Sequence, residues 1–453
     1  MWTEERWKLT AMALNGREAR PAMILPLLAA AFKELDQARI DYCVLRGHEE
    51  VLAGTIDGDV DLLVAVEQLG RMQRILERLG FVALARWGQA PHHFFVGYDD
   101  ANDVWLKLDV MTELAYGRPI PALRTDLAAD CLANRVRHGP LFAPAAGDEL
   151  IALLLHCLLD KKAFEPKYQA RLAELALCVD DDRSMNERVG RCLPATWLRI
   201  KELIAHGEWP ALLALQQAAA AHLARRDPAG TRWRGTIVPL LRFLDRRTRS
   251  FRTPGLTVAL LAPDGAGKTT LARALGSAFY LPTRYIYMGS NTNSGSVTLP
   301  TSRLLARLNG KRRTIVRGLA TLNNLVEQGV RYRVGAYHRR RGRLVVFDRY
   351  SAGSLVTAQQ DGALHKRLRR WALQLICPPP DIVVYLDAPA EVLYQRKREH
   401  SPELLERQRQ RYMKILDGVA RTAIIDAHSG PEEVRRRVAA VIWRRYAAVM
   451  QGK

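Results

Sequence analysis

The spacing of hydrophobic positions changes along the chain, and each change marks a different kind of structure. Apolar residues recur at helical spacing over residues 22–39, and short strand-like runs then follow up to about residue 135. Leucine and alanine recur at helical spacing over residues 147–226, which predicts a bundle of helices. After Pro254, short apolar runs alternate with helical stretches, a pattern typical of a parallel sheet covered on both faces. We therefore predict three domains, over residues 1–140, 141–250 and 251–453.

The predicted fold class of the C-terminal domain is α/β, with a five-stranded parallel sheet and flanking helices. An α+β domain and the helical bundle precede it. Parallel sheets of this kind bind ligands outside the carboxyl ends of their strands, so we expect functional residues directly after the strands. The predicted strands are residues 256–261, 284–288, 343–347, 381–386 and 422–426.

The turn after the first of these strands has the spacing of a phosphate-binding P-loop, with Ala262 in the place of the usual first glycine. The glycines of the turn let backbone N–H groups surround an anion, and the start of the next helix adds a favourable field. We expect the Lys268 ammonium to reach the β- and γ-phosphates and the Thr269 hydroxyl to ligate Mg²⁺. The predicted nucleotide-binding residues are Asp264, Gly265, Ala266, Gly267, Lys268, Thr269 and Thr270.

Two further motifs follow later strands, in an order that one enzyme family shares. Asp348-Arg349-Tyr350 follows the third strand and Asp387 the fourth, before an arginine-rich segment. With the P-loop, these motifs resemble thymidylate kinase over roughly residues 256–450. The resemblance implies ATP and Mg²⁺ as cofactors, an acceptor nucleotide placed by Asp264, an acceptor phosphate held by Arg349, and a lid that supplies arginines. The implied catalytic residues are Lys268, Asp348, Arg349, Arg396 and Arg398, with Arg407, Arg409 and Arg411 also in the lid, and the implied metal ligands are Thr269 and Asp348.

The chain departs from thymidylate kinase where that family recognises thymine. Residues 288–300 replace the family's Arg-Glu-Pro-Gly-Gly segment, and residues 327–330 lack its Asp-Arg-x-x-His element. The sequence therefore predicts phosphoryl transfer to a small molecule that carries a phosphate or a hydroxyl. A nucleoside monophosphate is the leading acceptor, and a sugar-containing acceptor stays open.

Three carboxylates of the N-terminal domain form a second candidate site. Asp59 and Asp61 alternate on one face of a predicted strand, and Asp109 lies on a later strand. With Gly47 upstream, the arrangement resembles the nucleotidyltransferase fold of the polymerase-β superfamily, although His48 stands where that family has glycine or serine. We predict that the three acids bind divalent metal and a nucleotide, and that mutual repulsion raises the pKa of at least one of them.

Three histidines receive a packing role rather than a catalytic one. His92 and His93 lie in an apolar run without a metal-ligand partner at suitable spacing, and His156 lies among leucines at helical spacing.

The six cysteines show no C-x-x-C pair, which is typical of reduced thiols in a cytoplasmic protein. No segment is long and apolar enough to predict a membrane span.

The net charge of +21 favours anionic partners. Nucleic acid is a weak candidate because no aromatic and basic platform accompanies the charge. Residues 231–254 mix arginines with large apolar residues. We expect this segment to be a connector that packs its apolar face on a neighbouring domain, while a peripheral contact with an anionic membrane stays open. An alternative function makes the P-loop domain a nucleotide-gated regulator of a nucleotidyltransferase.

Overall fold

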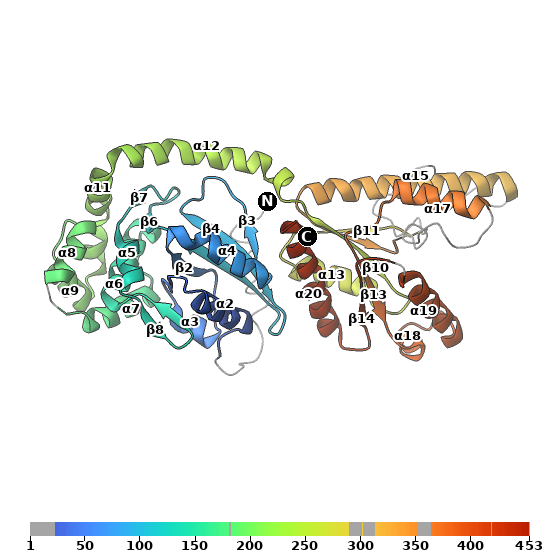
Figure 1. Ribbon diagram of the computed structural model, residues 1–453, viewed down its shortest axis with the longest axis horizontal. Coiled ribbons are helices and arrows are strands. Elements are labelled where there is room, and N and C mark those ends of the chain that lie inside the picture. Colours follow the sequence, from blue (N-terminus) through green and yellow to red (C-terminus); the bar gives the residue numbers. More distant parts are fainter. Residues whose placement is uncertain are drawn as a thin grey trace. The chain divides into compact units, whose positions relative to one another are not determined.

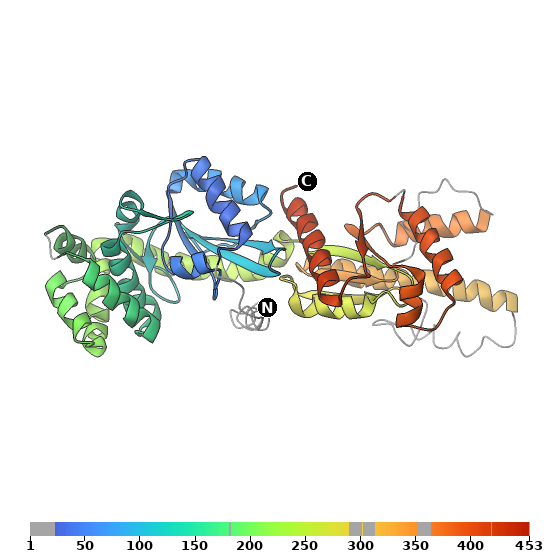
Figure 2. The same ribbon diagram turned by 90° about the horizontal axis from the view of Figure 1, so that it is seen from below.

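The computed structural model describes residues 23–180, 183–289, 301, 313–350, 364–417 and 419–452. The chain folds into two compact units, residues 1–249 and 250–453. Figure 1 labels the helices and strands of both units, and Figure 2 shows them from below. No described helix combines the length and the apolar character that a membrane crossing requires.

The N-terminal unit is built on a mixed five-stranded sheet with the order β1-β2-β5-β4-β3. Strands β2 and β5 are parallel neighbours, and the other pairs are antiparallel. The strands are β1 (Tyr42–Val44), β2 (Val60–Val64), β3 (Val82–Leu84), β4 (His92–Asp99) and β5 (Val104–Met111), with two hairpins β6 (Ala115–Tyr116), β7 (Leu123–Arg124) and β8 (Val136–His138), β9 (Leu141–Ala143). The α+β character expected from the sequence is confirmed.

Alternation along the strands divides this sheet into two faces. Even-numbered positions of β2 and β5, such as Leu62 and Leu108, share a buried core with Phe32 of one helix and Leu76 of another. Those helices are α2 (Pro26–Gln37) and α4 (Leu69–Arg78), and the short helices α3 (His48–Ala53) and η1 (Val66–Gln68) lie in the connections. The opposite face of the sheet carries Asp61 and Asp109 and packs against the helical layer.

The helical layer packs directly on the sheet. Leu63 of β2 and Met111 of β5 belong to the same buried core as Leu154 and Trp197 of the helices, so sheet and helices form one unit. The helices are α5 (Leu127–Ala133), α6 (Ala146–Leu155), η2 (His156–Lys161), α7 (Pro166–Cys178), α8 (Arg183–Cys192), α9 (Trp197–Ala205), α10 (Trp209–Ala214) and α11 (Gln216–Arg226). Segment η2 is a π-helical turn, which is rare and interrupts the regular ladder of α6.

The connector is one helix, α12 (Pro228–Arg252). The sequence predicts that its apolar face packs on a neighbouring domain, and this expectation is wrong for the largest side chains that the structure describes. Trp233 is 65% exposed, Leu240 53% and Phe243 54%, while Asp245 is the buried one among the side chains that the structure describes on this helix. The reason is that polar contacts hold α12 on the N-terminal unit, among them the hydrogen bond from the Trp87 backbone N–H to Asp245.

The C-terminal unit is a five-stranded parallel sheet with the order β11-β12-β10-β13-β14, which confirms the predicted fold class. All six residues of the central strand are buried, because helices cover both of its faces. The strands are β10 (Leu256–Leu261), β11 (Thr283–Tyr287), β12 (Leu344–Asp348), β13 (Ile382–Asp387) and β14 (Thr422–Asp426).

Helices cover this sheet in two layers. Ala259 and Phe347 on one face share a core with residues of α15, α17 and α19, such as Tyr332, Ile376 and Leu416. Helices α13 and α20 pack on each other, and both contact the sheet. The helices are α13 (Lys268–Ala278), α15 (Arg313–Arg340), α17 (Leu364–Ile376), α18 (Ala390–Arg396), α19 (Pro402–Leu416) and α20 (Pro431–Met450).

Candidate functional site

The P-loop connects β10 to α13. Gly265 and Gly267 have φ values of +89° and +84°, in the left-handed region that glycine adopts without strain. Gly267 is also the residue before α13, and a Cβ added there would meet no atom within 4 Å. The loop therefore presents open space at the N-terminus of a helix of eleven residues, beside the exposed Thr269 and Thr270.

Lys268 is folded onto this loop. Its Nζ donates to the carbonyl oxygens of Ala262 at 2.9 Å and Pro263 at 2.8 Å. Burial lowers the pKa of Lys268, and the carboxylates of Asp264 and Asp348 act in the opposite direction. The ammonium thus lies between two acids from two different strands, at the position where the sequence predicts a phosphate.

Asp348 ends β12, next to the end of β10. In the parallel register Asp348 pairs with Leu260, and its neighbour on the other side is Tyr287. Its side chain is 3% exposed, and its Oδ2 accepts a hydrogen bond of 2.5 Å from the Tyr285 hydroxyl. Its Oδ1 is buried and has no hydrogen-bond partner among the residues that the structure describes. A buried carboxylate oxygen of this kind needs a partner, and a hydrated cation can supply one.

Arg349 connects the Asp-Arg-Tyr motif to the P-loop. Its backbone has a φ of +56°, which costs a non-glycine residue about 1–2 kcal/mol. Its Nη2 lies 2.7 Å from Oδ1 of Asp264, and its guanidinium lies 6.0 Å from the centre of the Tyr287 ring. The unusual backbone places the guanidinium beside the P-loop, where a second phosphate group could bind.

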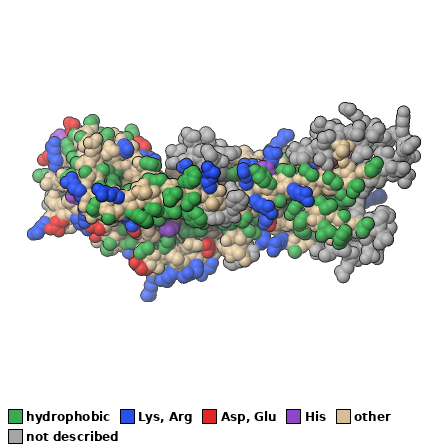
Figure 3. All heavy atoms as spheres, turned by 90° about the horizontal axis from the view of Figure 1, so that it is seen from above, with side chains coloured by type: hydrophobic (Ala, Val, Ile, Leu, Met, Phe, Trp, Pro, Cys, Tyr) green, Lys and Arg blue, Asp and Glu red, His purple; other side chains and the backbone are tan. Residues whose placement is uncertain are grey.

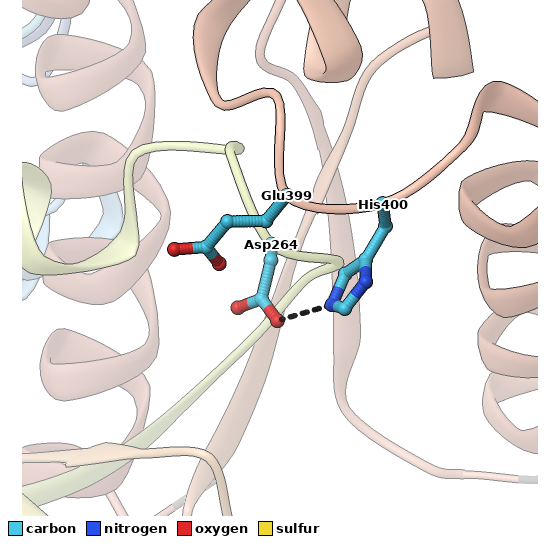
Figure 4. Close-up of side chains that lie close together, drawn as sticks. All are labelled: Asp264, Glu399 and His400. Atoms are coloured by element: carbon cyan, nitrogen blue, oxygen red, sulfur yellow. Dashed lines mark ion pairs between the residues drawn. The ribbon is translucent and has the colours of Figure 1, made fainter.

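Glu399 and His400 approach Asp264 from the segment between α18 and α19 (Figure 4). His400 Nε2 lies 3.8 Å from Asp264 Oδ2, and the possible ligand atoms of the three residues lie within 4.8 Å of one another. Sequence reasoning missed Glu399 and His400, although their place inside the predicted lid is a usable signal. Arg349 and Lys268 also lie beside Asp264, and Glu399 pairs with Lys397 at 3.0 Å, so charged side chains of the lid segment and of the P-loop lie close together.

The predicted lid arginines make different contacts. Arg396 donates to the carbonyl oxygen of Ala427 at 2.8 Å, and Arg398 is exposed. Arg409 forms a bidentate pair with Asp387, at 2.6 and 2.8 Å. Thus Asp387 at the end of β13 holds α19, which carries Arg407, Arg409 and Arg411 of the predicted lid.

The two segments that depart from thymidylate kinase are described in part. Residues 290–300 lie outside the described residues. Glu327 is buried and its Oε1 accepts a hydrogen bond of 2.6 Å from Arg331, which also donates to the carbonyl oxygen of Gly289 at 2.7 Å. The structure therefore gives Arg331 a structural partner and a place near the end of β11.

In the N-terminal unit the three predicted acids lie on one face of the sheet. Asp61 of β2 and Asp109 of β5 are direct neighbours across the parallel pair, and Asp59 precedes β2 by one residue. The sequence did not foresee that each acid has a basic partner: Lys107 for Asp59, Arg46 for Asp61, and His92 for Asp109. Arg46 donates from Nε at 3.0 Å and from Nη2 at 2.5 Å, and the distance from His92 Nδ1 to Asp109 Oδ1 is 2.9 Å.

The pKa values in this cluster follow from burial first. Burial raises the pKa of Asp59, Lys107 opposes that rise, and the charges of Asp109 and Asp61 add to it. The predicted rise is confirmed, although burial rather than repulsion is its largest cause. Burial lowers the pKa of His92, but its hydrogen bond to Asp109 and the charge of Asp109 outweigh burial, so the net shift is upward.

The predicted packing role of His92 is therefore incomplete, since its ring contacts one of the acids. His156 is buried as predicted, and its Nδ1 lies 3.0 Å from Oδ2 of Asp160 within the π-helical turn. Burial, assisted by the charge of Arg46, lowers the pKa of His156 to about 4. His48 begins α3 and is buried against His138, with ring centres 4.7 Å apart.

Comparisons with known proteins support the C-terminal site. Residues 263–438 match the family described as thymidylate kinase. Among solved structures, one described as "Structure of Thymidylate Kinase from Candida albicans Reveals Origin of Broad Substrate Specificity and a Novel Structural Element" is 17% identical to this chain, covering 41% of this chain and 89% of that chain with a TM-score of 0.30. No curated protein matches the chain. The family match supports a kinase-type phosphotransferase domain in the C-terminal unit.

Proposed function

We propose that the C-terminal unit transfers the γ-phosphoryl group of ATP, with Mg²⁺, to a small-molecule acceptor. The observation that carries the proposal is the in-register ending of β10 and β12, which brings Lys268, Asp348 and the Arg349–Asp264 pair around one phosphate loop. Such transfer depends on positioning and on neutralising charge, and this group of side chains supplies both signs of charge at short range.

The residues present fit both implied groups. The open, left-handed Gly267 at the start of α13 suits a polyphosphate, because a side chain at this position would occupy the space above the loop. The unpartnered Oδ1 of Asp348 and the exposed hydroxyl of Thr269 suit a hydrated Mg²⁺. Bound Mg²⁺ would balance the charge of the phosphates during the transfer.

Each residue then has a defined task. Lys268 would leave the carbonyls of Ala262 and Pro263 and bind the phosphates through the same Nζ, whose protonated form polyphosphate favours. Arg349 would bind the acceptor end with a planar guanidinium that Asp264 orients. The segment with Glu399 and His400 would exclude water from the loop.

The acceptor class follows from what surrounds Arg349. The guanidinium suits an acceptor that carries a phosphate, or one that offers hydroxyl oxygens as hydrogen-bond acceptors. A nucleoside monophosphate is the first candidate. We expect thymidine monophosphate to be a poor acceptor, since residues 288–300 and 327–330 lack the segments with which thymidylate kinases recognise thymine. A sugar-containing acceptor is the alternative within the same chemistry.

The test is acceptor-dependent release of ADP from the whole chain. Nucleoside monophosphates, sugars and glycan precursors are compared by kcat/KM with ATP and Mg²⁺ in excess. A kinase releases ADP only with an acceptor, whereas a nucleotide-gated regulator shows slow turnover that ignores it. If thymidine monophosphate is the best acceptor, with a value of about 10⁵ M⁻¹s⁻¹ or more, the acceptor assignment is wrong and the unit is a divergent thymidylate kinase.

A second candidate function concerns the N-terminal unit. The direct pairing of Asp61 with Asp109 on one sheet face favours a divalent cation and nucleotide site completed by Asp59. These acids would exchange their basic partners for metal, since Lys107 and Arg46 could turn to phosphate instead. Metal-dependent binding of a fluorescent nucleotide to a Lys268→Ala chain, lost on Asp59→Asn with Asp61→Asn, tests this candidate without the P-loop.

A further inference from the structure

Helix α12 is fastened to the N-terminal unit by polar contacts on one side. Arg234 Nε donates to the carbonyl oxygen of Ala122 at 2.9 Å, and Arg242 Nε donates to that of Gly88 at 2.8 Å. Asp245, which is 1% exposed, accepts a hydrogen bond of 3.1 Å from the backbone N–H of Trp87. These contacts span about three turns, so they set which side of the helix faces outward.

The outward side carries large hydrophobic side chains, which we call the α12 stripe: Trp233, Leu240, Phe243 and Leu244. They are 65%, 53%, 54% and 39% exposed, and their spacing places them along one helical face. Trp87, itself 43% exposed, meets α12 through its backbone N–H, which binds Asp245 on the inward side of the helix. Figure 3 looks onto this side and shows hydrophobic and basic side chains together along α12. A continuous exposed apolar surface of this kind usually marks a docking site.

The exposed charged side chains that the structure describes on α12 are positive. Arg232, Arg246 and Arg247 are exposed, and the guanidinium of Arg247 lies 5.1 Å from the centre of the Phe243 ring. The only acid in the sequence of α12 is Asp245, and it is turned inward. A partner that complements this surface therefore combines an apolar region with neighbouring negative charges.

We propose that the α12 stripe binds an anionic lipid surface, with α12 lying in the plane of the headgroups. Trp, Leu and Phe side chains reach the boundary of the acyl chains, while flanking arginines stay with the phosphates. A second copy of the chain fits less well, because a symmetric contact would set the exposed arginines of one α12 against those of the other, and the acid of the helix, Asp245, is buried. Nucleic acid fits less well because Leu240 and Leu244 have no ring on which a base could stack.

The test is cosedimentation of the full chain with vesicles. Phosphatidylcholine vesicles with about one third phosphatidylglycerol should bind the chain at least ~10-fold more tightly than phosphatidylcholine alone, and added salt should weaken binding. Replacing Arg246 and Arg247 by Gln should weaken binding roughly 30-fold, since each arginine near the surface contributes about a factor of five. Trp233→Ser with Phe243→Ser should weaken it at least ~10-fold.

The matched control is Leu177→Ser with Leu198→Ser, which removes two exposed leucines (87% and 57%) from other helices of the same unit. It should bind like the unchanged chain. The proposal is overturned if neither vesicle binds, or if the control loses as much affinity as the stripe variant. It is also overturned if the stripe instead mediates dimers in light scattering or RNA binding, with vesicles bound equally by all variants. Circular dichroism checks that every variant is folded.

Discussion

The Nη2 of Arg349 lies 2.7 Å from Oδ1 of Asp264, and this pair joins the third strand's motif to the P-loop. The contact exists because β10 and β12 are parallel neighbours whose ends are in register, with Leu260 opposite Asp348. It also depends on the left-handed backbone of Arg349, since an extended residue would direct the guanidinium elsewhere. The strained backbone of Arg349 is therefore unfavourable locally, but it positions the guanidinium on the proposed acceptor side of the site.

Two substitutions of Arg349 test whether its backbone is strained. Arg349→Ala and Arg349→Gly should both lose acceptor turnover, by about 10²-fold or more, because both lack the guanidinium. Arg349→Gly should be more stable than Arg349→Ala by roughly 1 kcal/mol, since glycine accepts a φ of +56° without cost. Urea denaturation measures the difference in free energy of unfolding. Equal stability of the two variants would show that the turn relaxes in solution.

Lys268→Ala should abolish phosphoryl transfer, reducing acceptor-stimulated ADP release by about 10²–10³-fold or more. The fold should persist, because the side chain contacts only carbonyl oxygens of its own loop and nearby acids. Steady-state kinetics and thermal unfolding measure the two effects. Lys414→Ala, which removes an exposed lysine from α19, is the control and should keep full activity. Normal turnover in Lys268→Ala would refute the P-loop assignment.

Asp61→Asn should destabilise the N-terminal unit by about 2 kcal/mol, because it leaves the guanidinium of Arg46 without its charged partner. The pKa of Arg46 lies above its usual value: burial opposes its charge, and Asp61 outweighs burial. A guanidinium keeps its proton in proteins, so Arg46 stays charged when Asp61 is replaced. Adding Arg46→Met should recover most of the loss, and a double-mutant cycle in urea measures the coupling. Additive losses would mean that the pair is not formed in solution.

The stability of the N-terminal unit should fall between pH 6.5 and pH 4. The pKa of His156 is lowered to about 4 by burial, while an unfolded histidine titrates near 6.5. In this window the unfolded chain binds the additional proton, so the contribution of His156 is complete above pH 6.5 and is lost as the pH falls. The loss at pH 4 is about 3 kcal/mol.

His156→Gln removes this titration and keeps a hydrogen bond to Asp160. The drop in unfolding free energy from pH 6.5 to pH 4 should therefore be smaller in the variant, by about 3 kcal/mol. Hydrogen exchange of the α6 amides at both pH values measures the free energy of unfolding of the N-terminal unit by itself. His206→Gln is the control, because its ring lies at the surface beside the Glu202 carbonyl. An unchanged pH dependence in His156→Gln would show that His156 is solvated.

The sequence by itself determined the elements and the motifs at their ends. Buried β-branched runs such as Leu256–Leu261 predict strands wherever they occur, and the glycines before Lys268 require a particular turn, because both effects act over a few neighbouring residues. For the same reason, the alternation of Asp59 and Asp61 around Val60 is enough to assign both acids to one strand face.

Only the tertiary structure decided which of these groups meet. Register between strands far apart in the chain pairs Asp61 with Asp109, and the crossovers of the sheet bring His400 to Asp264. Local pattern carries no information on such pairings, so Lys107, Arg46 and His92 were not foreseen as partners of the acids. Local pattern also does not show which side of α12 faces the protein. An arginine that binds a backbone carbonyl, such as Arg242, and an arginine in water look the same in the sequence. Long-range hydrogen bonds decide which arginines face inward.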